Sequence, residues 1–380
     1  MVLYISVFLT SLVFAFLADT CQRQLMADDE QAGPARKSRL GSLGFIRGTR
    51  NAFAAISALV LILLMGLRYN TGYDYVYSYV PSLNDNRRGD KSHYDPLFNW
   101  IIALFAKFDD NQWFFFGMSV ITIVLMYVAF YLNSKFIVLP LAYFLFSFHY
   151  LRAFCFVAQY VTMAVACVAF VLLLRKRWWW AFGLVILAGF LHISAFLLLP
   201  FFLCYFLRNR VLAIVSLVLP ALALLFQGVA RAIVAYLVQG SRFAYYISGE
   251  FDTRYTDKSL VAVNLVFYIA FIVVYFLRQQ DLLSSKRATM FLFAQSVCFS
   301  FTLLQSMIPV GYRLVWYFMV FQCFSIPYFI GKATRGSLYY MVNGVVLVAF
   351  CIWMIYGPIA NGSSAVLPYH PVFAPEVSIT

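Results

Sequence analysis

The alternation of long apolar runs with short charged loops is the feature that most constrains this sequence. Hydrophobic residues make up 63% of the 380 residues and charged residues only 11%, whereas a soluble globular domain carries about 25% charged residues. The runs approach the length that a helix needs to cross a bilayer, and they are not the alternating segments of a membrane barrel. The sequence therefore predicts an all-α, polytopic membrane protein folded as a helical bundle.

About twelve membrane-spanning helices are expected, some of them short or re-entrant, in one transmembrane domain that covers residues 1–380. In the ambiguous run 179–207, basic residues at both ends favour a hairpin with His192 near its tip, whether its arms cross fully or re-enter. The expected spans lie at roughly 2–18, 52–67, 113–131, 136–148, 154–174, 179–191, 193–207, 211–227, 260–277, 288–303, 314–330 and 338–356.

The distribution of basic residues predicts the orientation of the chain. Most of the 28 Lys and Arg residues fall in the loops 19–51, 132–135, 175–178, 208–210, 278–287 and 331–337. The positive-inside rule makes these loops cytoplasmic, which puts both termini and the loops 68–112 and 228–259 outside. The net charge of +13 is then an orientation signal, so no nucleic-acid partner is expected. Segment 19–51 is predicted to be a flexible basic loop.

Three arginines at expected outer helix boundaries are candidates for ligand binding: Arg68, Arg152 and Arg313. Charged groups at membrane depth are costly and by default mark function. A guanidinium grips phosphate oxygens with two parallel donors, although each arginine could instead be a snorkelling interface anchor. We predict that the three converge on one outward-facing polar pocket, which the loops 68–112 and 228–259 cap.

Two nearby side chains are candidates for a base. Asp74 lies in the aromatic-rich loop after Arg68, where low dielectric could favour proton transfer, or it could be a structural partner of an arginine. His192 could be a base, a hydrogen-bond donor to a ligand or a packed polar residue. Asp95 has the position of a helix cap, and His149 lies one helical turn before Arg152.

The first outer loop also carries aromatic side chains that could bind a ligand. Residues 96–107 begin with Pro96 and repeat apolar side chains at helical spacing, which predicts an interfacial helix lying on the membrane. Residues 229–239 are a second such segment or part of a neighbouring span. Flat aromatic faces for ligand binding are expected from Tyr73, Tyr75, Tyr77 and Trp100.

Several chemistries lack their usual sequence signals. The chain has no phosphate-binding glycine loop, no dinucleotide fingerprint and no H-E-x-x-H zinc motif. Its seven cysteines are scattered singly, without metal-ligand spacing. No cofactor and no metal site are therefore expected. No cleavable signal peptide is evident, and residues 2–18 are interpreted as the first span.

Five short motifs follow one another in a fixed order along most of the chain. They are Leu67-Arg-Tyr69 with Gly72-Tyr-Asp-Tyr75, Tyr94-Asp-Pro-Leu-Phe98, Leu191-His-Ile-Ser-Ala195 with Leu199-Pro200, Tyr312-Arg313 with Tyr317-Phe318, and Leu367-Pro-Tyr369. Together they resemble the motifs of the Wzy-type polysaccharide polymerases, in particular their EpsG-like branch. Asp95 stands for the glutamate and Leu97 for the glycine of the branch's E-P-G-F step, Tyr73 replaces a usual threonine, and Ala153 replaces a frequent glutamine.

The resemblance implies a GT-C-like membrane glycosyltransferase in the bacterial inner membrane. Such an enzyme joins undecaprenyl-diphosphate-linked repeat units into O-antigen, capsule or exopolysaccharide at the outer face. It uses no metal and works beside a flippase and a chain-length regulator. Two alternatives stay open: a flippase or transporter of the same lipid-linked sugars, and a ligase that transfers finished glycan.

The resemblance also suggests a role for each candidate residue. Arg152 and Arg313 would bind the donor diphosphate with help from Arg68, and Asp74 or His192 would orient or deprotonate the acceptor hydroxyl. Further substrate contacts are expected from Asp95, His149, Tyr312 and Tyr317, beside the loop aromatics Tyr73, Tyr75, Tyr77 and Trp100.

Overall fold

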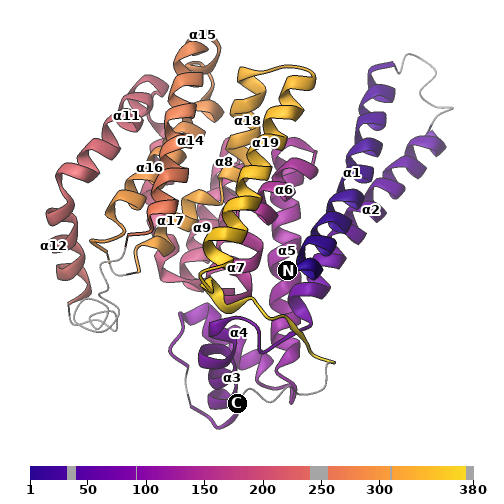
Figure 1. The fold of residues 1–380 in the computed structure, drawn as a ribbon, viewed down its shortest axis with the longest axis vertical. Helices are drawn as coiled ribbons and strands as arrows, with labels where there is room; N and C mark the ends of the chain where they lie inside the picture. Colours follow the sequence, from indigo (N-terminus) through magenta and orange to yellow (C-terminus); the bar gives the residue numbers. More distant parts are fainter. Residues whose placement is uncertain (32–39, 91, 240–255, 309, 374–380) are drawn as a thin grey trace. The chain divides into compact units, whose positions relative to one another are not determined.

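The computed structural model describes residues 1–31, 40–90, 92–239, 256–308 and 310–373, and helices dominate it (Figure 1). Its first elements are α1 (Val2–Gln31), α2 (Leu40–Gly66), β1 (Arg68–Tyr69), the π-helix η2 (Tyr75–Tyr79), α3 (Val80–Arg87), α4 (Pro96–Phe105), α5 (Gln112–Ser134), α6 (Val138–Phe146), α7 (His149–Cys155), α8 (Val157–Leu174), α9 (Trp178–Leu191), η3 (Ile193–Leu197), α10 (Leu198–Leu203) and η4 (Cys204–Phe206). The remainder are α11 (Asn209–Leu225), α12 (Gln227–Val238), α14 (Lys258–Leu277), α15 (Gln279–Leu282), α16 (Lys286–Leu304), α17 (Tyr312–Met319), α18 (Gln322–Ala333), α19 (Ser337–Met354), η5 (Ile355–Ile359), η6 (Ser363–Ala365) and β2 (His370–Pro371).

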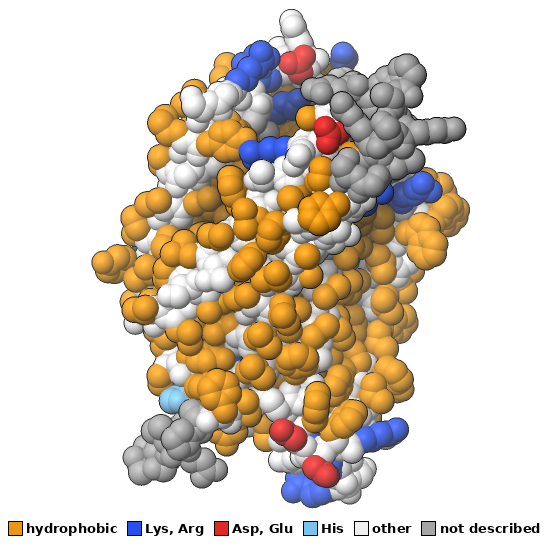
Figure 2. Space-filling model, turned by 90° about the vertical axis from the view of Figure 1, so that its right-hand side faces the viewer, with side chains coloured by type: hydrophobic (Ala, Val, Ile, Leu, Met, Phe, Trp, Pro, Cys, Tyr) orange, Lys and Arg blue, Asp and Glu red, His pale blue; other side chains and the backbone are white. Residues whose placement is uncertain are grey.

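Seven helices of the described chain are long and apolar enough to cross a membrane, and counting each of three bent helix pairs as one span gives up to ten. The prediction of an all-α polytopic membrane protein is confirmed. The bent pairs are α6 with α7, α11 with α12, and α17 with α18. The expected total of about twelve, some of them short or re-entrant, also includes 179–191 and 193–207, which form the shorter apolar helices Trp178–Leu191 and Ile193–Phe206. Figure 2 shows hydrophobic side chains over most of the face in view, with Lys and Arg toward its ends.

The chain divides into two compact units, one made of Met1–Phe196 with Val346–Thr380 and the other of Leu197–Val345. In the first unit α1 and α2 lie side by side (Figure 1), α2 packs on α5, and α8 contacts both α5 and α9. Apart from Leu172 and Leu174, every residue of α8 is buried, so this helix forms the centre of the first unit.

Small hydroxyl side chains join three helices of the first unit. Ser57 Oγ on α2 donates to the Ser11 carbonyl oxygen on α1 at 2.7 Å and contacts the Tyr127 hydroxyl on α5 at 2.6 Å. Short polar side chains let helices approach closely inside a bilayer and satisfy one another there. These contacts fix the α1–α2 pair against α5.

Buried amides join the helices of the second unit. Gln322 Nε2 donates to Asn264 Oδ1 at 2.8 Å and to Gln295 Oε1 at 2.9 Å, which connects α18 to α14 and α16. Gln295 Nε2 in turn donates to the Asn264 carbonyl oxygen at 3.0 Å. All three side chains are at most 3% exposed, so each depends on the others for hydrogen bonding.

Segment 19–51 differs from the flexible loop that the sequence predicts. Helix α1 continues to Gln31 and α2 begins at Leu40, and residues 32–39 lie outside the described part. Polar contacts stabilise the extended ends: the Asp19 carboxylate accepts the Ile137 amide at 2.9 Å, and Arg50 Nη1 donates to Gln22 Oε1 at 2.7 Å. Hydropathy identifies only the apolar part of a helix. In α1 and α2 this part is shorter than the helix itself.

Candidate active site

The loop after α2 begins with a fully buried arginine. Arg68 is 0% exposed; its Nη1 donates to the Met65 carbonyl oxygen and its Nη2 to the Phe154 carbonyl oxygen at 3.0 Å. The guanidinium also lies over the Phe115 and Phe154 rings, at 4.9 and 5.1 Å. Burial lowers the pKa of Arg68 to about 10, which leaves it charged at neutral pH. Arg68 therefore holds the loop against α5 and α7.

The C-terminal segment fixes the same loop from the other side. Strand β1 pairs antiparallel with β2, so that Arg68 faces Pro371, and the Gly72 amide donates to the Ala365 carbonyl oxygen at 2.9 Å. Gly72 has φ +98°, and a Cβ there would lie 2.8 Å from the Phe154 carbonyl oxygen. Only glycine fits this turn without strain. The path of the chain into Asp74 is thus fixed by residues far apart in the sequence.

The aromatic residues of the loop alternate between the core and the surface. Tyr75 and Tyr79 are buried, whereas Tyr73 and Tyr77 are 54% and 80% exposed. Tyr75 stacks on Phe115 with ring centroids 4.0 Å apart, and burial raises its pKa to about 12. Of the three loop tyrosines predicted to bind a ligand, Tyr75 is therefore a neutral packing residue, whereas Tyr73 and Tyr77 are exposed to a ligand.

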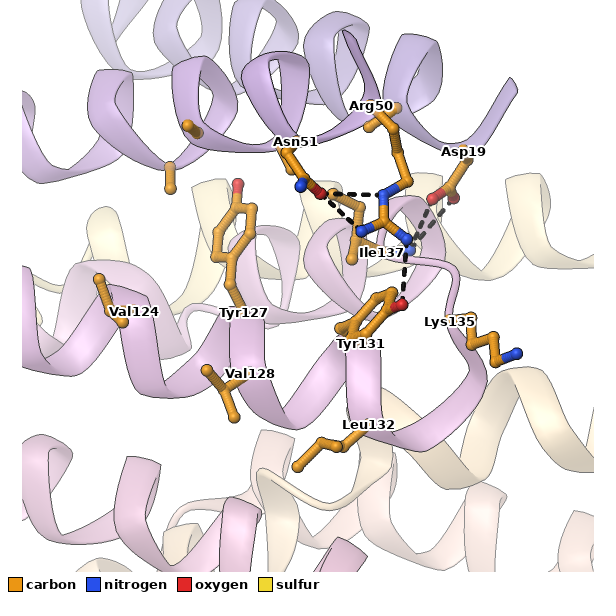
Figure 3. A pocket seen from close by; sticks show the side chains of 14 residues that line it. Asp19, Arg50, Asn51, Val124, Tyr127, Val128, Tyr131, Leu132, Lys135 and Ile137 are labelled. Carbon is orange, nitrogen blue, oxygen red and sulfur yellow. Dashed lines mark hydrogen bonds between the residues drawn. The ribbon is translucent and has the colours of Figure 1, made fainter. Parts of the chain in front are cut away.

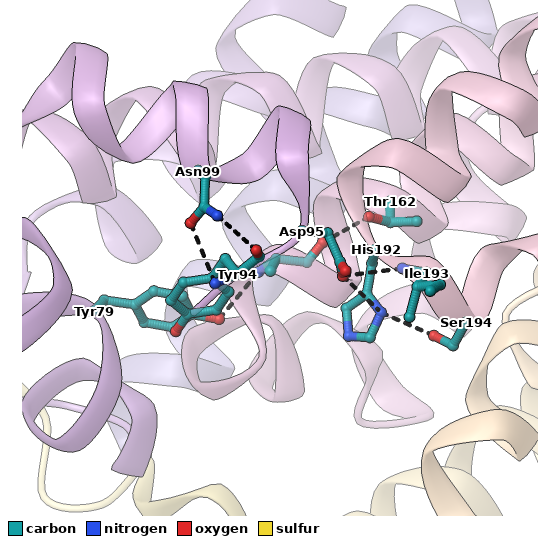
Figure 4. A network of polar contacts seen from close by, with 9 residues as sticks. Tyr79, Tyr94, Asp95, Asn99, Thr162, His192, Ile193 and Ser194 are labelled. Carbon is teal, nitrogen blue, oxygen red and sulfur yellow. Dashed lines mark hydrogen bonds and ion pairs between the residues drawn. The ribbon is translucent and has the colours of Figure 1, made fainter. Parts of the chain in front are cut away.

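Two predicted site residues from distant segments, Asp95 and His192, lie side by side (Figure 4). Asp95 Oδ2 lies 3.9 Å from His192 Nδ1 and accepts the Ile193 amide at 3.0 Å. His192 Nδ1 also contacts Ser194 Oγ at 2.9 Å. The Asp95 side chain is 10% exposed and that of His192 29%, so a partly open imidazole rests on a nearly buried carboxylate.

The backbone explains how His192 reaches this position. Helix α9 ends at Leu191, and His192 is extended with φ −152° and ψ 116°, which confirms the expected break at His192. Asp95 stands at the N-cap of α4, but its side chain makes no capping hydrogen bond there. Asp95 therefore has the expected N-cap position, but its carboxylate accepts the Ile193 amide of the turn after α9 instead of capping α4.

A stack of tyrosines links this cluster to the loop around Asp74. The Tyr79 and Tyr94 rings lie parallel at 5.6 Å, and the Tyr79 hydroxyl accepts the Ala158 amide at 3.0 Å. Burial raises the pKa of Tyr79 well above its usual value, and the nearby Tyr94 and Asp74 raise it further. Asn99 Nδ2 donates to the Tyr94 carbonyl oxygen at 2.6 Å. The two candidate bases, Asp74 and His192, thus belong to one contiguous part of the first unit.

The other predicted residues of the first unit differ in their exposure. His149 is 0% exposed, with Nδ1 3.0 Å from the Tyr160 hydroxyl, and Arg152 is 4% exposed. The Arg152 guanidinium lies over the rings of Phe148 and Trp353, at 5.0 and 5.6 Å. Trp100, on α4, is 63% exposed. Arg152 and His149 therefore lie among aromatic residues, while Trp100 is open to a ligand or to lipid.

Three predicted residues, Tyr312, Arg313 and Tyr317, lie on α17 in the second unit. Arg313 and Tyr312 are half-buried, and the Tyr312 ring lies 5.2 Å from Trp316. Tyr317 is 1% exposed and therefore packs in the core. The meeting of Arg313 with Arg68 and Arg152 stays a prediction.

Several residues of the cluster escaped the sequence reasoning as individual candidates. Ser194, Asn99 and Tyr79 each contact a predicted site residue or its neighbour. Only Ser194 carried a signal, since it belongs to the His-Ile-Ser motif quoted for the resemblance. In the part of the chain that the structure describes, no group of three or more His, Cys, Asp or Glu side chains has an arrangement that could hold a metal ion.

Comparison with known proteins gives one family. The family model described as "EpsG family" matches residues 51–370, which is most of the chain and includes every predicted site residue. No curated protein and no solved structure matches the chain. The chain therefore belongs to the EpsG family, and this membership indicates a membrane polysaccharide polymerase of the glycosyltransferase type.

Proposed function

We propose that this protein joins lipid-diphosphate-linked oligosaccharide units into a long polysaccharide at the outer face of a bacterial inner membrane, with undecaprenyl diphosphate as the carrier. Family membership supports the reaction class. The observation that supports the site assignment is the contact between Asp95 and His192. These residues come from different segments of the family match, and Asp95 Oδ2 lies 3.9 Å from His192 Nδ1.

In the proposed reaction, His192 is the general base. The acceptor sugar hydroxyl attacks the anomeric carbon of the donor, its proton passes to the His192 imidazole, and the bond from that carbon to the lipid diphosphate breaks. The Asp95 carboxylate stabilises the imidazolium that forms and holds the turn at Ile193. A base and an orienting carboxylate in this arrangement follow the general logic of proton transfer in enzymes.

The arginines have separate roles in this proposal. Arg152 and Arg313 bind the donor diphosphate and stabilise the charge that develops on it as it leaves. Arg68, because it is fully buried against backbone carbonyl oxygens, acts as a positioning residue for the loop that carries Asp74. The exposed rings of Tyr73, Tyr77 and Trp100 offer flat faces to the sugars.

Cells that carry His192→Ala in place of the wild-type chain test the proposal. We expect single repeat units on the outer glycolipid and no long polysaccharide, at normal membrane levels of the protein. The control is His93→Ala, because His93 is an exposed histidine of the same loop to which the proposal gives no role. Units trapped at the cytoplasmic face would instead indicate a flippase. Full-length polymer in the His192→Ala cells would refute the role of His192.

A reaction with purified protein separates a polymerase from a ligase. Defined diphosphate-linked oligosaccharides supplied as both donor and acceptor should give a ladder of products that stay attached to the lipid diphosphate. The ladder should persist when EDTA removes divalent metal. Transfer only to an acceptor that is not lipid-diphosphate-linked would favour the ligase.

A further inference from the structure

A pocket of about 360 Å³ lies between α1, α2 and α5 in the first unit (Figure 3). None of the residues that line it belongs to the candidate active site. The positive-inside pattern predicts that this end of the three helices is cytoplasmic, opposite to the face expected for catalysis. The pocket is therefore a feature that the proposed reaction does not use.

One part of the pocket is apolar and open to the lipid-facing surface. The pocket exists because α2 has small side chains here, those of Ala54, Ala55 and Ala58. The opposite wall is formed by Val124 and Val128 on α5. The two valines are 44% and 39% exposed. Exposed apolar side chains on a membrane-spanning helix face acyl chains, so the pocket is continuous with the lipid around the protein.

The other part of the pocket is cationic. Arg50 Nη1 donates to Gln22 Oε1 at 2.7 Å and to the Tyr131 hydroxyl at 3.0 Å, and its Nε donates to Asn51 Oδ1 at 3.1 Å. Figure 3 shows the guanidinium held between Asn51 and Tyr131. All these partners are neutral, and no carboxylate in the described part of the chain forms an ion pair with Arg50. Lys135, which is exposed, also lines the pocket.

Among the described residues that line the pocket, Asp19 is the acidic one, and backbone amides already stabilise its charge. The Asp19 carboxylate accepts the Ile137 amide at 2.9 Å and the Val138 amide at 3.0 Å, at the start of α6. A helix N-terminus stabilises negative charge. The Asp19 carboxylate therefore stabilises the N-terminus of α6. The positive charges of Arg50 and Lys135 can then bind an anion.

We propose that this pocket binds an anionic phospholipid of the surrounding bilayer. Its phosphate lies between Arg50 and Lys135, and one acyl chain follows the groove between the α2 alanines and Val124. Two cations at the headgroup favour a net negative lipid over a zwitterionic one, and anionic lipids are concentrated in the cytoplasmic leaflet. Arg50 is held in place by its neutral partners, which reduces the entropy lost on binding.

Native mass spectrometry of the full, delipidated chain with added phosphatidylglycerol or phosphatidylcholine tests the proposal. Wild type should retain phosphatidylglycerol in preference to phosphatidylcholine, and Arg50→Gln should lower phosphatidylglycerol retention roughly tenfold, because charge-assisted hydrogen bonds are lost. The matched control is Arg47→Gln. It removes the same charge from an exposed position of α2 that does not line the pocket, so retention should be unchanged.

A second variant tests the groove without changing the cation. Ala55 is exposed and lines the pocket, so Ala55→Phe should fill the groove and lower phosphatidylglycerol retention while the unfolding midpoint stays unchanged. Equal retention of phosphatidylglycerol by wild type, Arg50→Gln and Ala55→Phe would overturn the proposal. So would equal retention of the two lipids by wild type, or displacement of phosphatidylglycerol by inorganic phosphate or by undecaprenyl phosphate at matched concentration.

Discussion

The Asp95 carboxylate illustrates how a residue in a helix-capping position can serve another element. Its backbone begins α4, yet Oδ2 accepts the Ile193 amide and lies beside the His192 imidazole. A carboxylate held by a backbone amide has a fixed position, and it favours positive charge on a neighbouring imidazole. Asp95 thus has two roles: it fixes the turn after α9, and it places a negative charge beside the His192 imidazole.

Asp95→Asn separates these two functions. The amide oxygen can still accept the Ile193 amide, but the negative charge beside His192 is lost. We expect the polymerisation rate constant kcat to fall roughly 100-fold, within the range for general-base catalysis, with little change in KM, unfolding midpoint or membrane level. The control is Asp85→Asn, which removes an exposed carboxylate paired with Arg88. An Asp95→Asn enzyme with wild-type kcat would contradict the assignment.

Gly72→Ala tests the turn that leads into Asp74. A Cβ there would meet the Phe154 carbonyl oxygen at 2.8 Å in addition to the strain of φ +98°. We expect a lower unfolding midpoint, with a cost of about 3 kcal/mol from strain and steric overlap together. Gly89→Ala has a similar φ of +90°, and no atom of the described residues lies within 4 Å of the added Cβ. It should cost only about 1 kcal/mol, so equal shifts would exclude a role for close packing at Gly72.

The sequence indicated candidate site residues but not the residues that they contact. It singled out Arg68, Asp95 and His192 from residue type and position. It could not show that Arg68 is fully buried or that Asp95 contacts a turn 98 positions later. Such contacts depend on how the helices pack, and a single sequence contains no direct signal for that. The family motifs succeeded because they record several such positions together.

At the scale of elements, hydropathy predicted helices better than their ends and bends. The sequence placed spans on α5, α8 and α14 close to their observed ranges. It missed the polar extensions of α1 and α2 and the bends of 50° to 79° within three helix pairs. Local composition determines which segments enter lipid, whereas bends and extensions depend on contacts such as that of Asp19 with the start of α6.

The amide network of the second unit gives a prediction at this scale. Gln322→Leu removes the donor to both Asn264 Oδ1 and Gln295 Oε1 and should cost about 1–2 kcal/mol, as for interhelical hydrogen bonds in membranes. The unfolding midpoint in detergent measures the loss. Gln279→Leu, a substitution of the same kind at an exposed position of α15, should have little effect. Equal unfolding midpoints for the two variants would show that the amide network does not contribute to stability.

At the scale of the whole molecule, the segment around residues 365–372 ties the first unit together. The Tyr4 hydroxyl donates to the Val366 carbonyl oxygen at 2.6 Å, and the Tyr369 hydroxyl donates to the Leu64 carbonyl oxygen at 3.0 Å. With the pairing of β1 and β2, these bonds join α1, the end of α2 and the loop before Asp74.

Truncation tests this role of the segment. A chain that ends at Val366 loses β2 and the Tyr369 contact, so we expect a lower unfolding midpoint and loss of polymer. A chain that ends at Phe373 keeps every residue that the structure describes after Val366 and should behave as wild type. Polymer production and the unfolding midpoint are measured for both truncated chains and for wild type. Wild-type behaviour of the shorter chain would show that the active-site loop holds its shape without β2.

The bond from the His370 amide to Thr71 Oγ1 spans 299 positions of the chain. During synthesis, residues 67–72 therefore leave the ribosome long before the strand that completes their ladder. Most of the helices must enter the bilayer while this ladder has only one strand. The loop at residues 67–72 thus reaches its final form late in biogenesis, and nascent or prematurely terminated chains lack its second strand.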